Sequence, residues 1–170
     1  MIIEPVESIP DLFLVRDVYD SELLEQFLSE DRVNWNRVKL PMQEDYDRDT
    51  VERFDKSSVW NQMIASVDRY KLLDIKLQFG RSVCWMDNPG FCMGTHRDNR
   101  HVWAAMQVYL TDGDPGYGTH FYDHPGATPF VVPYKKNCGY VMINQKQLHG
   151  VPVTVKTFRM STYTWLTPKS

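Results

Sequence analysis

The segment MGTHRDNRHVW, residues 93–103, carries two potential metal ligands two positions apart, His96 and Asp98. Side chains at this spacing point to the same side of an extended chain. Both could therefore face one ion if the backbone is strand-like here. A loop histidine beside an aspartate that caps a turn would give the same pattern, so the pair needs support from the rest of the chain.

That support comes from the C-terminal third, where QLHGVPV supplies His149 and TFRMSTYTWL places Arg159 and Ser161 on one face of an expected strand. Two histidines and one carboxylate on one side of an iron ion leave positions for a co-substrate and dioxygen, as in non-haem Fe(II) oxygenases. A 2-oxoacid would fill two of these positions. Its far carboxylate matches a guanidinium fork, which makes Arg159 the candidate partner, assisted by the Ser161 hydroxyl.

The elements that would carry these residues are short strands. From about residue 74 onward, segments rich in β-branched and aromatic residues alternate with Gly, Pro, Asn and Asp. These segments are KLQFGRSVCW, HVWAAMQVYL, GTHFYD, PFVV, GYVMIN, HGVPVTV and TFRMSTYTWL. Their number and spacing predict a sandwich or jelly roll around a central cavity, a class that includes cupin-like barrels. In the segment around Gln107, the face with Trp103, Ala105 and Tyr109 is expected to line the cavity.

The first part of the chain is expected to be helical. DSELLEQFLS, residues 20–29, has capping residues followed by a leucine and phenylalanine stripe, and VWNQMIASVDRY, residues 59–70, shows a second helical period. The polar segment 31–55 lacks a clear period and is interpreted as a loop that closes over the substrate as a lid. We expect one domain over residues 1–170, with a helical part at about 1–73 and a β core at about 74–166.

Composition narrows the class of protein. The chain has 170 residues, a formal net charge of -3 and three cysteines without a CxxC pair. This disfavours nucleic-acid binding, a disulfide framework and a cysteine-rich zinc site. The N-terminus carries acidic residues where a signal peptide would be basic and apolar, and no apolar run is long enough to cross a membrane. We therefore expect a cytoplasmic protein without a membrane partner.

Taken together, these pieces resemble the 2-oxoglutarate/Fe(II)-dependent dioxygenase superfamily, and within it the prolyl 4-hydroxylase-like branch. The resemblance covers about residues 74–166. The matching pieces, in chain order, are HRD (96–98), QVYLTD (107–112), GTHFY (118–122), GYVMIN (139–144), LHGV (148–151) and RMS (159–161).

The resemblance implies a mainly β (α+β) double-stranded β-helix, jelly-roll and cupin-like, with N-terminal helices packed outside. It implies iron ligands at His96, Asp98 and His149, and Arg159 with Ser161 on the distal carboxylate of 2-oxoglutarate. Tyr109 matches a tyrosine that bonds the same carboxylate in part of the family. Trp85 departs from the pattern, because the family often has a tyrosine near this position; either that contact is missing or the indole N–H replaces it.

The resemblance also implies the chemistry. Fe(II), 2-oxoglutarate and dioxygen would be used to hydroxylate a C–H bond, with 2-oxoglutarate decarboxylated to succinate and ascorbate as a supporting reductant. The substrate is left open between a peptide or protein, with a prolyl residue as one case, and a small molecule. The alternatives are a non-catalytic metal-binding β-barrel that acts as a sensor or binding module, and an oxygenase acting on a nucleobase or metabolite. The oligomeric state is also open.

The remaining histidines and cysteines support weaker alternatives. His120 and His124 have zincin-like spacing, but Pro125 and Gly126 follow and no glutamate comes after His120. His101 is interpreted as a strand-start histidine, with a supporting role near the metal as the alternative. A thiol nucleophile at Cys92 has no further support in the sequence.

Overall fold

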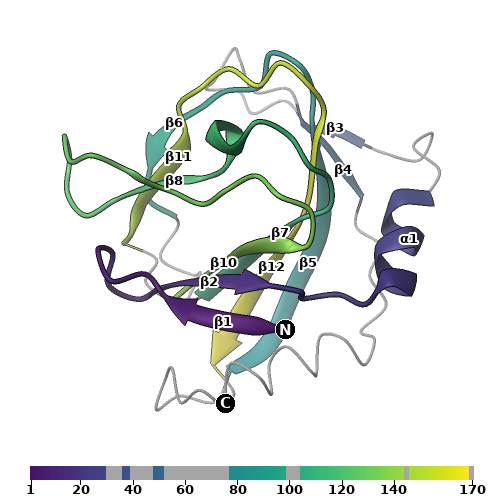
Figure 1. Cartoon of the computed structure of the whole chain (residues 1–170), viewed down its shortest axis with the longest axis horizontal. Helices are drawn as coiled ribbons and strands as arrows, with labels where there is room; N and C mark the ends of the chain where they lie inside the picture. Colours follow the sequence, from purple (N-terminus) through teal and green to yellow (C-terminus); the bar gives the residue numbers. More distant parts are fainter. Residues whose placement is uncertain (30–35, 39–47, 52–76, 99–103, 144–145, 169–170) are drawn as a thin grey trace.

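The computed structural model describes residues 1–29, 36–38, 48–51, 77–98, 104–143 and 146–168. Two antiparallel sheets dominate these residues (Figure 1). The strands of the larger sheet are, in chain order, β1 (Ile2–Pro5), β2 (Leu12–Arg16), β3 (Asn36–Val38), β4 (Arg48–Val51), β5 (Leu77–Asp87), β7 (Ala104–Tyr109), β10 (Cys138–Met142) and β12 (Arg159–Pro168). The smaller sheet contains β6 (Met93–His96), β8 (His120–Tyr122), β9 (Phe130–Val131) and β11 (Leu148–Val151).

Strand order departs from chain order in both sheets. The larger sheet runs β1-β2-β10-β7-β12-β5-β4-β3 and the smaller one β6-β11-β8-β9. Neighbouring strands therefore come from distant parts of the sequence, as in the predicted jelly roll. Each of the seven segments predicted as strands contains one. A further strand, β6, ends at His96, so the extended strand that was expected to carry both His96 and Asp98 stops before Asp98.

The inner core lies between the two sheets. Phe121 of β8 packs against Tyr140 of β10, with ring centroids 4.7 Å apart, and Tyr109 and Tyr163 of the larger sheet belong to the same buried cluster. Aromatic side chains of this size bury large apolar areas, which favours closure of the sandwich. Strands β7, β10 and β12 contribute the larger-sheet side of this core, so they would position the residues of any site between the sheets.

Strand β7 is buried on both sides. Met106 and Val108 pack in an outer cluster that also contains Leu24 of the helix, whereas Ala105 and Tyr109 face the inner core and Gln107 reaches a cavity there. The predicted division into two faces is confirmed for these residues, although most of the inner face is core rather than cavity wall. Trp103 lies outside the described residues.

Strand β10 approaches β7 very closely at Gly139. A Cβ atom at this position would lie 1.8 Å from the carbonyl oxygen of Gln107, a contact that no side chain tolerates. The glycine is therefore needed for the pairing of β10 with β7, and it helps to fix the strand that carries Gln107 into the cavity.

The predicted first helix is confirmed as α1 (Ser21–Ser29), which covers the outer face of the larger sheet (Figure 1). Its first turn begins with a hydrogen bond from the Leu24 amide to the Asp20 carbonyl. The residues predicted as a second helix lie outside the described ranges. No helix among the described residues is long and apolar enough to span a membrane.

Two expectations about the first part of the chain were wrong. Residues 1–73 are not simply helical, because β1 and β2 extend the larger sheet beyond β10, so the β core begins well before residue 74. The segment 31–55 is not a continuous loop either. It contains β3 and β4, which pair with each other, and β4 pairs with β5 at the other edge of the larger sheet. These strands are short and are stabilised by pairing with distant residues, which local sequence patterns do not report. Whether the rest of 31–55 closes over a substrate falls outside the described residues.

Candidate metal and co-substrate site

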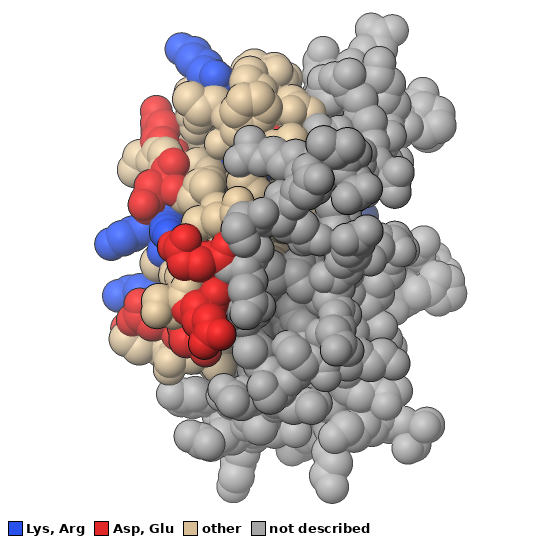
Figure 2. All heavy atoms as spheres, turned by 90° about the vertical axis from the view of Figure 1, so that its right-hand side faces the viewer, with Lys and Arg blue, Asp and Glu red and all other residues tan. Residues whose placement is uncertain are grey.

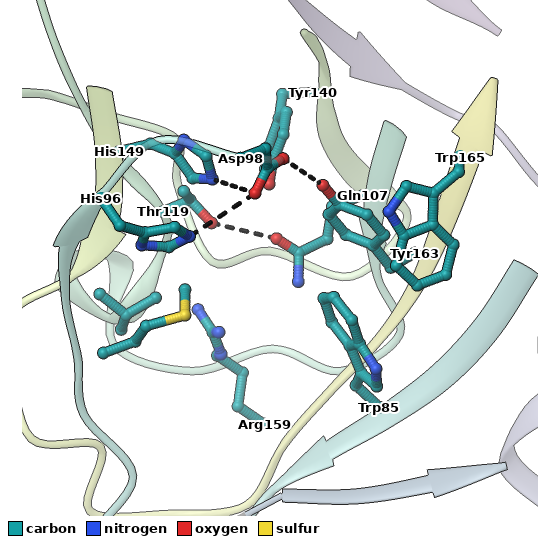
Figure 3. Close-up of a pocket in the computed structure, with 12 residues that line it drawn as sticks. Trp85, His96, Asp98, Gln107, Thr119, Tyr140, His149, Arg159, Tyr163 and Trp165 are labelled. Atoms are coloured by element: carbon teal, nitrogen blue, oxygen red, sulfur yellow. Dashed lines mark hydrogen bonds and ion pairs between the residues drawn. The ribbon is translucent and has the colours of Figure 1, made fainter. Parts of the chain in front are cut away.

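Two adjacent strands of the smaller sheet bring the histidines together. His96 at the end of β6 pairs directly with His149 of β11, and the two ring centroids lie 4.5 Å apart. Directly opposed residues of an antiparallel pair place their side chains on the same face. Asp98 follows His96 by two residues and turns its carboxylate toward both rings, as Figure 3 shows.

The three side chains converge on one point. Asp98 Oδ1 lies 3.6 Å from His96 Nε2 and 3.7 Å from His149 Nε2, and one ligand atom from each residue lies within 4.8 Å of the others. A single cation with bonds of about 2.0–2.2 Å to nitrogen and oxygen can bridge atoms at these separations after small adjustments. The donor set and its spacing therefore fit a divalent transition metal.

Backbone carbonyls select which histidine nitrogens face the gap. The Nδ1 atom of His96 lies 3.0 Å from the Gly94 carbonyl oxygen, and Nδ1 of His149 lies 2.9 Å from the Gln147 carbonyl oxygen. In the neutral rings, Nδ1–H donates to these carbonyls, which leaves the Nε2 lone pairs directed at the gap. Such outer contacts orient metal-binding histidines and raise their basicity.

Tyr163 orients the aspartate. Its hydroxyl donates to Asp98 Oδ2 at 3.0 Å, so Oδ1 is the oxygen that faces both histidines. Burial by itself raises the pKa of Asp98, but the hydrogen bond from His96, the charge of His149 and the Tyr163 bond together lower it. Burial lowers the pKa of His149 and outweighs the opposing effect of Asp98. Both shifts favour the metal-binding protonation states, a carboxylate and a neutral imidazole.

A guanidinium lies at the other end of the same cavity. Arg159 at the start of β12 is fully buried and lines the cavity, about 170 Å³ in volume, together with the three candidate ligands. Its Nε donates to Asp87 Oδ2 at 2.7 Å, Nη2 lies 2.6 Å from the same oxygen, and Nη1 donates to the Tyr117 carbonyl at 2.7 Å. Burial by itself lowers the pKa of Arg159, but the Asp87 carboxylate and the tyrosines nearby raise it, so the group stays charged.

Ser161 and Tyr109, both predicted at the co-substrate, lie one layer behind the cavity wall and are fully buried. Gln107 Nε2 donates to Ser161 Oγ at 2.8 Å, and Gln107 Oε1 accepts from the Thr119 hydroxyl at 3.1 Å. The Tyr109 hydroxyl accepts from the Thr119 amide at 2.8 Å. Gln107 and Thr119 are thus the residues of this network that line the cavity.

An aromatic wall made of Trp85, Tyr163 and Trp165 closes the side of the cavity across from the histidines (Figure 3). Trp85 stacks on Tyr163 with centroids 4.4 Å apart, and Trp165 meets both rings edge-on at 6.0 and 4.8 Å. Trp85 therefore lies in the predicted cavity. Its contact with a co-substrate stays a prediction.

The other histidines lie elsewhere. His120 is buried, with Nε2 3.0 Å from the Gly116 carbonyl oxygen, and His124 is exposed, with Nδ1 3.1 Å from the Pro125 carbonyl oxygen. Among the described residues, neither belongs to a cluster that could hold a metal. His101 lies outside the described residues. Cys92 is partly buried and does not line the cavity with His96.

Sequence reasoning placed Gln107 on the cavity face but missed three other partners of the predicted residues, which are Asp87, Thr119 and Tyr163. One of them carried a readable signal: Tyr163 continues the two-residue period of Arg159 and Ser161 along the last strand. Asp87 carried none, because its pairing with Arg159 depends on the register of β12 against β5, between residues 72 positions apart in the chain.

Comparisons with known proteins place the fold. No family model matches the chain, and no curated protein matches it in sequence. Solved structures do match. A prolyl-4-hydroxylase from Pseudomonas putida has a TM-score of 0.67 at 15% identity, with 94% of each chain covered. The viral collagen prolyl hydroxylase of Paramecium bursaria Chlorella virus-1, in complex with 2-oxoglutarate, has a TM-score of 0.67 at 11% identity, over 92% of this chain and 95% of that one.

A third match is HygX from Streptomyces hygroscopicus with nickel, 2-oxoglutarate and hygromycin B bound. It has a TM-score of 0.64 at 12% identity, over 94% of this chain and 83% of that one. At such low identities the likeness shows the fold. The predicted double-stranded β-helix of the 2-oxoglutarate oxygenases is thereby confirmed.

Proposed function

We propose that this protein is an Fe(II)- and 2-oxoglutarate-dependent oxygenase that hydroxylates a C–H bond of its substrate. The observation that carries the proposal is the convergence of His96, Asp98 and His149 around one point, within a fold shared with solved enzymes of this kind. A two-histidine, one-carboxylate set with open positions is the typical iron site of such oxygenases.

The triad would hold the metal through the two Nε2 atoms and Asp98 Oδ1, because these atoms already face one another. Arg159 would bind the distal carboxylate of 2-oxoglutarate from the far end of the same cavity. Ser161 and Tyr109 would not touch the co-substrate directly. Their hydrogen bonds would instead position Gln107 and Thr119, which line the cavity. The Trp85 ring would bound the co-substrate on the aromatic side.

When bound, iron and 2-oxoglutarate supply the oxidising power, with 2-oxoglutarate decarboxylated to succinate as the C–H bond is hydroxylated. The protein's share is positioning. Tyr163 and the carbonyls of Gly94 and Gln147 orient the ligand side chains, and the aromatic wall bounds one side of the cavity. Ascorbate is a candidate supporting reductant by family resemblance alone.

For the substrate, we propose a peptidyl residue or a small molecule. The matched structures include prolyl hydroxylases and HygX, which binds hygromycin B, so the same fold serves both classes in those proteins. The aromatic wall suits an apolar ring or chain. A nucleic-acid substrate is disfavoured by the net charge of -3, and Figure 2 shows acidic and basic side chains interspersed on the described part of one face.

The domain organisation and the cellular location are part of the proposal. We propose a single domain over residues 1–170, because the candidate site draws on strands from both sheets. A cytoplasmic location fits the free Cys84, Cys92 and Cys138.

The test is anaerobic addition of Fe(II) and 2-oxoglutarate to the purified protein, monitored by the visible charge-transfer absorption of the iron complex. The band should appear for the wild type and weaken in His96→Ala and Arg159→Ala. Succinate release with candidate peptides and small molecules then separates an oxygenase from the second candidate, a non-catalytic metal-binding barrel. Metal binding without any succinate would favour the barrel.

A further inference from the structure

The Arg159 guanidinium in the cavity is already paired with the carboxylate of Asp87. Arg159 and Asp87 are both fully buried, and strand register places them opposite each other on β12 and β5. Two guanidinium nitrogens approach the same carboxylate oxygen, at 2.7 and 2.6 Å. The pair is therefore close to neutral as a unit, although it occupies the position where an incoming anion needs a positive charge.

Part of the guanidinium is still available to a ligand. A guanidinium carries five N–H donors. The bonds to Asp87 and to the Tyr117 carbonyl use Nε and one donor on each of Nη1 and Nη2. Since Arg159 lines the cavity, an incoming carboxylate can reach this end without breaking the existing ion pair. It would, however, bind a cation whose charge is already offset, with the Asp87 carboxylate close by.

We propose that Asp87 is an internal counter-ion that competes with the distal carboxylate of the 2-oxoacid for Arg159 and so sets the affinity and selectivity of this end of the cavity. This inference depends on the proposed function. It makes Asp87 a specificity-determining residue, because a compensated guanidinium discriminates less strongly between a dicarboxylate and a monocarboxylate 2-oxoacid than a bare one does.

Asp87 has a physical role in the protein without a bound 2-oxoacid. A fully buried arginine without a counter-ion strongly destabilises a fold, because its charge is removed from water without compensation. Asp87 provides the compensation whether or not a ligand is bound. The consequence is weaker binding of the ligand's own carboxylate, since both anions share one cation in a water-poor site.

The competing interpretation is that Asp87 only orients Arg159, and it predicts the opposite sign. If orientation were the whole role, Asp87→Asn would weaken 2-oxoglutarate binding. An asparagine oxygen can still accept from Nε or Nη2, and the Tyr117 carbonyl still holds Nη1. The neutral variant therefore removes the competing charge while it keeps most of the geometry.

The experiment compares two ligands that differ only at the distal end: 2-oxoglutarate and 2-oxopentanoate, which has a methyl group in place of that carboxylate. Dissociation constants are measured anaerobically with Fe(II) from the charge-transfer band, for wild type, Asp87→Asn and the control Asp123→Asn. The control removes the same charge from an exposed position. We expect Asp87→Asn to bind 2-oxoglutarate about tenfold or more tightly, with 2-oxopentanoate changed less than about twofold. The control should match the wild type.

Unchanged or weaker binding of 2-oxoglutarate by a folded Asp87→Asn protein would overturn the inference. If the Asp87→Asn variant does not fold, the ratio of the two wild-type dissociation constants tests the inference instead. A preference for 2-oxoglutarate over 2-oxopentanoate below about a hundredfold supports an Arg159 charge already offset by Asp87. A larger preference, as expected when the ligand alone pairs with a buried guanidinium, overturns the inference. A wild type that gives no band with either acid would instead refute the proposed function. The two failures are thus distinguishable.

Discussion

The two ends of the cavity handle charge in opposite ways. At the metal end, Asp98 is held by the Tyr163 hydroxyl and faces two histidine rings, so its negative charge is directed at the gap between the ligand atoms. At the other end, Arg159 is paired with Asp87 inside the protein. At the candidate metal end the ligand atoms of three side chains face one another, whereas at the arginine end the charge is already paired within the protein. The difference predicts that changes at the metal end affect binding most, and that changes at the arginine end also affect folding.

The largest effect is expected when a proposed metal ligand is removed. His149→Ala leaves two of the three donors, so Fe(II) affinity should fall by more than the roughly 100-fold that is the upper range for losing an outer contact. Anaerobic iron titration measures the loss, and far-UV circular dichroism should show that the fold is kept. Iron affinity close to the wild-type value would remove His149 from the site.

A large effect on stability is expected at the arginine end. Arg159→Ala removes the guanidinium that pairs with the fully buried Asp87 carboxylate, which should lower the free energy of unfolding by about 3–5 kcal/mol. Urea denaturation measures this change. The double variant Asp87→Leu/Arg159→Met removes both charges and should recover most of the loss. If the double variant is no more stable than Arg159→Ala, the ion pair does not account for the cost.

A smaller effect is expected at the residue that orients the aspartate. Tyr163→Phe removes the hydroxyl bonded to Asp98 and keeps the ring that stacks on Trp85. Outer contacts of this kind typically contribute about 10–100-fold to metal affinity, so Fe(II) binding should weaken within that range. The stacked ring makes phenylalanine a matched replacement. Wild-type affinity in this variant would show that Asp98 needs no orienting bond.

The smallest effect is expected outside the cavity. His124 is exposed, so His124→Ala should change iron affinity by less than about twofold and leave the unfolding midpoint nearly unchanged. The same titration used for His149→Ala checks this. A loss comparable to that of His149→Ala would revive a metal site in the segment from His120 to His124.

Much of the fold could be predicted because its signals are local. Strands β5 and β7 to β12 follow from runs of β-branched and aromatic residues, and α1 follows from its apolar stripe. Strands β1 to β4 could not be found this way. They are short, β3 and β4 are also polar, and their stability comes from pairing at the edges of a sheet whose other strands lie far along the chain.

The candidate site also has a part that local sequence predicts and a part that depends on contacts between distant segments. The sequence by itself determined which residue types are available and that Arg159 and Ser161 share a strand face, whereas for His96 and Asp98 it gave only a spacing of two residues. Only the tertiary structure decided which distant partners meet, because strand register is a property of two segments at once. It placed His149 opposite His96 and Asp87 opposite Arg159, and so brought the candidate residues into one cavity with a candidate metal-binding end and an end where the arginine charge is already paired.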